Sequence, residues 1–99
     1  MIENYIQYLS GYNKDNIILS DVEEAIIEIQ KSDDEHGAFW VSVITEEEEN
    51  VIETDKYLNL AIVFEGIQTN YEAKNWIEVK ELYHLLLSKK FELIKQRIK

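Results

Sequence analysis

The two histidines, His36 and His84, are the side chains of this chain best suited to acid–base or metal chemistry at neutral pH. His36 follows Asp33, Asp34 and Glu35, and together these residues offer oxygen and nitrogen ligands to a metal ion. Adjacent residues on a short loop seldom all face one ion, and their spacing matches neither a zinc pattern nor a calcium loop. His84 lies on a predicted helix, where a half-buried or surface histidine is the ordinary role. We therefore expect no metal site.

Nucleophilic and phosphate-binding groups are equally sparse. The chain has no Cys, which excludes thiolate nucleophiles, disulfides and Cys-bound zinc. No serine lies in a G-x-S-x-G elbow, and the three isolated glycines cannot build a phosphate-binding loop. We expect no catalytic residues, no cofactor and no enzymatic activity. A small hydrolase or metal-dependent enzyme stays open only if the fold brings titrating groups together in a pocket near a histidine.

Acidic side chains outnumber basic ones in this sequence. Twenty Asp and Glu against ten Lys and Arg give a formal net charge of −10, and Glu46, Glu47, Glu48 and Glu49 are consecutive. This charge disfavours direct binding to nucleic acid or to an anionic membrane and favours a basic partner. The glutamate run has two interpretations. It is either a solvated loop that keeps a strand edge from pairing with other chains, or an anionic patch that meets Lys and Arg of a partner.

The acidic residues fall into separate clusters along the chain. Residues 1–72 hold seventeen acids and three bases, a net of −14, whereas residues 73–99 hold three acids and seven bases, a net of +4. The two densest acidic clusters are Asp33-Asp34-Glu35 and the run from Glu46 to Glu49. The strand predicted between them would place them about 26 Å apart, at opposite ends of a sheet. We favour the glutamate run as the partner-binding patch, with exposed tyrosines near it as the residues that supply most of the affinity. The candidate partner-binding residues are Glu46, Glu47, Glu48 and Glu49, continued by Glu53 and Asp55, then Asp33, Asp34, Glu35 and Tyr57.

A strand, a turn, a helix and a central strand are predicted to position these clusters in the first half of the chain. Residues 2–9 are rich in Tyr and Ile, and residues 11–16 form a polar turn. Ser20 and Glu23 predict a capping box for a helix whose apolar residues recur at helical spacing. The helix should end near Ser32. The apolar run 38–45 predicts a central strand covered on both faces.

More strands and a closing helix are predicted in the second half. Strands are expected over 51–54 and 57–64, with a further short one over 67–71. Asn75 and Glu78 begin a helix that continues as one long helix or two joined near Ser88, with Trp76 largely buried. The order β-α-β-β-β(-β)-α predicts a single α+β domain over residues 1–99, with an antiparallel or mixed sheet of four to five strands and two main helices.

Two adjacent strands and a closing helix in residues 51–98 carry a resemblance to a known family. The strands are Val51-Ile-Glu-Thr-Asp55 and Tyr57-Leu-Asn-Leu-Ala-Ile-Val-Phe64, and the helical part runs from Asn75-Trp76-Ile-Glu-Val-Lys-Glu-Leu82 to Lys89-Lys90-Phe91 and Ile94. This arrangement, in an acidic protein of about a hundred residues without Cys, resembles small immunity proteins of bacterial polymorphic-toxin and contact-dependent growth inhibition systems.

The resemblance implies a cytoplasmic antitoxin that binds one cognate toxin domain tightly and blocks its activity. Many such toxins are nucleases, so it implies a basic partner such as a ribonuclease or deoxyribonuclease, and no catalytic residues in the inhibitor. The N-terminus has no secretory signal pattern and no apolar run approaches the ~20 residues of a membrane span, which also predicts a cytoplasmic protein. The alternative is an acidic nucleic-acid mimic that occupies a nucleic-acid-binding protein, with its acids spread over one face.

Overall fold

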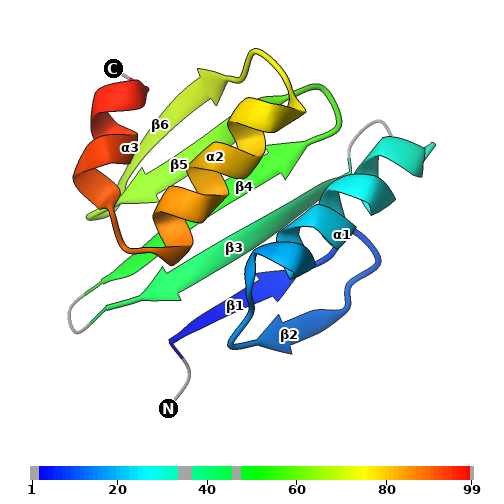
Figure 1. The fold of residues 1–99 in the computed structure, drawn as a ribbon, viewed down its shortest axis with the longest axis horizontal. Helices are drawn as coiled ribbons and strands as arrows, with labels where there is room; N and C mark the ends of the chain where they lie inside the picture. The colour runs from blue at the N-terminus through cyan, green and yellow to red at the C-terminus, as the bar shows by residue number, and fades with distance from the viewer. Residues whose placement is uncertain (1–2, 34–36, 46–47, 99) are drawn as a thin grey trace.

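The computed structural model describes residues 3–33, 37–45 and 48–98, which form one antiparallel sheet with three helices packed on it (Figure 1). The strand order is β2-β1-β3-β4-β5-β6. The α+β class is confirmed, with six strands rather than four or five and three helices rather than two. The strands are β1 (Asn4–Gln7), β2 (Asn13–Asp15), β3 (Ala38–Ile44), β4 (Glu49–Asp55), β5 (Asn59–Phe64) and β6 (Ile67–Glu72), and the helices are α1 (Leu19–Lys31), α2 (Trp76–Leu87) and α3 (Phe91–Arg97).

The additional strand is β2, which lies within the segment predicted as a polar turn. All three of its residues are exposed, and it pairs with β1 in the register Tyr5↔Asp15 and Gln7↔Asn13. Asn, Lys and Asp are poor strand formers, so the pairing follows from the free edge of β1 rather than from local preference.

The first helix begins at a different capping residue from the one predicted. Leu19 is its first residue, and the carboxylate of Asp21 accepts a hydrogen bond of 2.9 Å from the backbone N–H of Ile18. Ser20 therefore lies inside the helix, and the capping box of Ser20 and Glu23 is wrong. The C-terminal end is as expected, because Ser32 follows the last helical residue.

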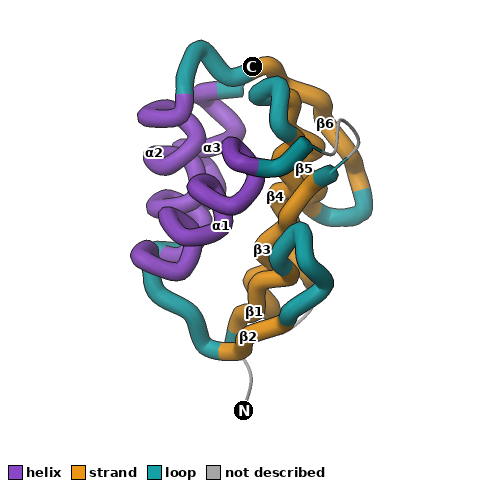
Figure 2. The backbone as a smooth tube through the Cα atoms, turned by 90° about the vertical axis from the view of Figure 1, so that its right-hand side faces the viewer, coloured by secondary structure: helices purple, strands orange, loops and turns teal. Residues whose placement is uncertain are grey.

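All three helices lie on one face of the sheet, as Figure 2 shows. Side chains such as Phe39, Val41 and Ile62, which alternate along the strands, form the core beneath them and are buried. The prediction that strand 38–45 is covered on both faces is therefore wrong. Trp40 and Ile44 point to the side without helices, where Ile44 is 39% exposed.

Two helices rather than one close the chain. They separate after Ser88, where Lys89 adopts a left-handed backbone conformation with φ of 59°. Trp76 is half-buried rather than largely buried, and packs against the core.

Tyr83 joins α2 to β4, because its hydroxyl donates to the carbonyl of Ile52 at 3.0 Å and accepts from Thr54 Oγ1 at 2.6 Å. Within the described residues, no helix is long and apolar enough to cross a membrane.

Candidate protein-binding site

The side of the sheet away from the helices is a continuous surface that we call the open face. It consists of the odd-numbered residues of β1, β2, β4 and β5 and the even-numbered residues of β3 and β6, because directly paired residues of an antiparallel sheet share a face. No helix covers it in the described part of the chain (Figure 2).

All charged side chains of the open face in the described strands are acidic. None of its residues is Lys, Arg or His in the strands that the structure describes. The carboxylates of Asp15, Glu53 and Glu72 form no hydrogen bond or ion pair with any described residue, so no described base neutralises their charge. Five acidic side chains in all belong to this face: Asp15, Glu49, Glu53, Asp55 and Glu72.

An apolar strip crosses the middle of the open face. Val51 pairs with Val63 on β5, and Trp40 pairs with Glu53 on β4. Tyr5 pairs with Ser42, which in turn pairs with Val51. Trp40, Tyr5 and both valines are half-buried, so part of each side chain is available for contact. An apolar centre with a polar rim is the usual anatomy of a protein–protein interface.

Glu49 anchors one corner of this surface through two hydroxyl groups. Its Oε1 atom accepts hydrogen bonds from Ser42 Oγ at 2.6 Å and from the Tyr5 hydroxyl at 2.9 Å. Burial, together with the hydrogen bond to the Glu49 carboxylate and its charge, raises the pKa of Tyr5 above its ordinary value, so the phenol ionises less readily than a free tyrosine. Ser42 is fully buried, and its hydroxyl shares the Glu49 carboxylate with Tyr5, which fixes the orientation of the Tyr5 ring.

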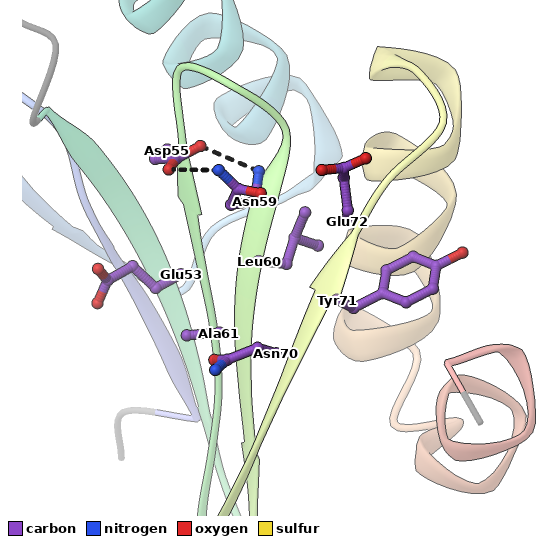
Figure 3. Close-up of a pocket in the computed structure, with 8 residues that line it drawn as sticks. All are labelled: Glu53, Asp55, Asn59, Leu60, Ala61, Asn70, Tyr71 and Glu72. Atoms are coloured by element: carbon purple, nitrogen blue, oxygen red, sulfur yellow. Dashed lines mark hydrogen bonds between the residues drawn. The ribbon is translucent and has the colours of Figure 1, made fainter.

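A shallow pocket lies where β4, β5 and β6 meet on the open face (Figure 3). Glu53 on β4 and Glu72 on β6 lie on either side of β5. The Asp55 carboxylate is occupied by the turn that follows it, since it accepts from the backbone N–H groups of Tyr57 and Asn59 and from Asn59 Nδ2, at 2.8, 3.0 and 3.1 Å. No group of three metal ligands converges among the described residues. The pocket suits an ammonium or guanidinium group brought by a partner.

The structure places part of the predicted acidic clusters. Glu48 lies in the turn between β3 and β4, where its carbonyl accepts from Thr45. Tyr57 is 55% exposed between β4 and β5, and Asp33 is exposed just after α1. His84 is exposed on α2, the surface position expected for it. The predicted residues Glu46, Glu47, Asp34 and Glu35, together with His36, lie outside the described residues.

Asp55 does not continue the glutamate run in space, which corrects the prediction. Glu49 pairs with Ile44 and Asp55 pairs with Ala38, so the two acids lie at opposite ends of β4, about 20 Å apart. The hairpin returns the chain along β3 and carries Asp55 away from the run. Of the predicted continuation, Glu53 lies between the two ends and points to the open face.

The most informative residue that the sequence did not single out is Trp40. It belongs to an apolar run in which every large side chain was expected to be buried. The signal against that expectation is Ser42, a polar residue two positions further along the same face of the strand. Asp15 and Glu72 were also missed. Each is an isolated acid in the sequence, and only strand pairing places it on the same face as the other acids.

Comparison of the chain with protein-family models, with curated proteins and with solved structures finds no match.

Proposed function

We propose that this protein binds and inhibits a basic protein through its open face, and that the partner is a toxin domain of the kind neutralised by small immunity proteins. One observation carries the proposal. Five acids, and no base of the described strands, surround a half-buried apolar strip that contains Trp40 and Tyr5. The resemblance of residues 51–98 to immunity proteins supports the class of partner, and a nuclease with a basic substrate groove fits the charge.

The two parts of this surface have different roles in binding. Unpaired acids such as Glu53 and Glu72 accelerate the encounter with a positively charged partner and reject acidic competitors. Affinity comes mainly from a few large side chains that lose contact with water, and aromatic residues are enriched among them. Trp40 and Tyr5 are the anchors that we assign, since both lie at the apolar centre.

The distribution of the acids also favours a second candidate, a nucleic-acid mimic. That function requires negative charge spread over one face rather than concentrated in loops, and Asp15, Glu53 and Glu72 lie on three different strands of one face. Both candidates need a basic partner. They differ in whether that partner is a toxin, so co-expression that rescues cells from the captured partner supports immunity, whereas a captured regulator of nucleic acid supports mimicry.

The test begins with capture of the partner from the native host and its identification by mass spectrometry. Association with that partner is then measured by stopped flow at low ionic strength for the wild type and for Glu53→Gln/Glu72→Gln. We expect association to slow roughly tenfold, because two unpaired charges of the binding surface are lost.

The matched control is Glu23→Gln/Glu24→Gln on α1, which changes the net charge equally on the helix-covered side. It should slow association much less. Equal effects of the two double variants would mean that only the overall charge matters. An unchanged rate in Glu53→Gln/Glu72→Gln would remove the open face from the interaction.

A further inference from the structure

The two edges of the sheet differ in how they are protected from pairing with other chains. β2 has only three residues and carries Lys14 and Asp15. At the opposite edge, β6 has six residues, and its first four, Ile67-Gln68-Thr69-Asn70, are exposed and uncharged. Its register with β5 is one-to-one from Phe64↔Ile67 to Asn59↔Glu72, without a bulge. Short length, charge, bulges and coverage by a helix are the features that block edges. In the described chain β6 has the charge of its terminal Glu72, and Lys95 of α3 lies near Ile67 and Thr69 on the helix side.

The turn between β5 and β6 determines which backbone groups of this edge are free. Glu65 and Gly66 have φ of 54° and 76°, as in a two-residue type I′ turn, so the flanking residues Phe64 and Ile67 form a hydrogen-bonded pair. Because such pairs alternate along an antiparallel ladder, the N–H and C=O groups of Gln68, Asn70 and Glu72 point away from β5. No described residue pairs with them.

We propose that β6 accepts an extended segment of the partner as a seventh strand, with Lys or Arg at alternate positions of that segment. The residues with free backbone groups, Gln68, Asn70 and Glu72, are the same ones whose side chains lie on the open face. Every second side chain of an added strand would therefore stand beside them, next to Glu72 and toward Glu53. This inference rests on the proposed function and specifies how the basic partner engages.

Charge also selects between a basic segment and a second copy of the chain. Pairing β6 with itself would join two acidic open faces edge to edge, in two molecules that each carry a formal net charge of −10. Repulsion opposes that arrangement and favours a positively charged strand.

The test uses a ten-residue peptide of alternating Lys and Thr, followed by amide hydrogen exchange of the protein in NMR. At saturation, exchange should slow at least tenfold at Gln68, Asn70 and Glu72, with little change at Thr69 and Tyr71, which already face β5. A peptide of alternating Glu and Thr, or the Lys peptide with alternate N-methylated amides, should not have this effect. Unchanged exchange at the three amides with millimolar Lys peptide would overturn the proposal.

The variant Asn70→Pro removes one outward N–H without removing a bond to β5 or changing the charge. It should bind the Lys peptide at least tenfold more weakly, whereas Asn70→Val should bind as the wild type does. Binding by Asn70→Pro at wild-type strength would contradict strand addition. If that variant does not fold, the exchange pattern of the wild type decides.

The two proposals fail separately with the captured partner. If Glu53→Gln/Glu72→Gln slows association while Asn70→Pro binds normally, the open face is used without strand addition. If the acidic substitutions have no effect, the proposed function fails, whatever the peptide does. A wild-type dimer in sedimentation that Asn70→Pro abolishes would assign the edge to a second copy and overturn the basic segment.

Discussion

The two faces of the sheet differ in whether their acidic side chains have basic partners. On the side of the helices, several acids have basic partners: Lys14 lies 2.7 Å from Asp21, and Arg97 lies 2.9 Å from Glu81. On the open face, no acid has a basic partner among the described residues. Five of the twenty acids therefore lie on a surface that carries no base in the described strands. A charge total alone would not reveal that surface.

Two buried acids on the helix side, Asp21 and Glu78, ionise readily because hydrogen-bond donors surround their carboxylates. Burial opposes the ionisation of Asp21, but hydrogen bonds from Lys14 and from the Ile18 N–H outweigh it and lower the pKa of Asp21. In the same way, burial opposes the ionisation of Glu78, and the Lys74 N–H and the Tyr71 hydroxyl lower its pKa. These carboxylates stabilise the fold, whereas the unpaired ones of the open face are free for a partner.

The largest effect should separate two adjacent residues of β3. Phe39→Ala removes a fully buried ring that stacks on Tyr83, and we expect it to lower the free energy of unfolding by about 3–5 kcal/mol. Trp40→Ala should cost less stability, about 1–2 kcal/mol, because part of that side chain is already exposed, yet weaken partner binding by about 2 kcal/mol. Urea unfolding and calorimetry of binding measure both. Similar losses of stability in the two variants would mean that the open face is structural.

An intermediate effect should appear in the pH dependence of stability. Because the pKa of Asp21 is lowered in the folded state, its contribution is complete above the pKa of the unfolded chain and is lost as the pH falls through the folded value. Asp21→Asn should therefore cost about 2 kcal/mol at pH 7 and progressively less in acid. Urea unfolding at pH 7, 4 and 2.5 measures the difference from the wild type, and Glu24→Gln, an exposed change on the same helix, is the control. A difference that does not vary with pH would contradict this account.

The smallest effect concerns the open face without its partner. Glu53→Gln/Glu72→Gln relieves repulsion among like charges and should raise the free energy of unfolding at low salt by about 0.3 kcal/mol. The control Glu23→Gln/Glu24→Gln should lower it slightly, because the ion pair of Glu23 with Lys80, at 3.9 Å, is lost. Thermal melts at low and high salt compare the two, and the differences should shrink as salt screens the charges. A loss of stability in the open-face variant would show that these acids are structural.

Local patterns predicted much of the fold. Strand β5, with its strict alternation, and the end of α1 at Ser32 were anticipated. The missed parts depend on contacts between distant residues. β2 exists because β1 offers an edge, and Asp55 lies far from Glu49 because a hairpin reverses the chain. Which face of β3 the helices cover depends on packing, so Trp40 could not be distinguished from Phe39 by residue type.

The absence of lysine from the open face of the described strands has a practical consequence. Reagents that attach proteins to a surface through primary amines would hold this molecule by groups such as Lys80 and Lys89, which lie on the helical layer or beside it. Immobilised in this way, the protein would present the carboxylates of its open face to the solution.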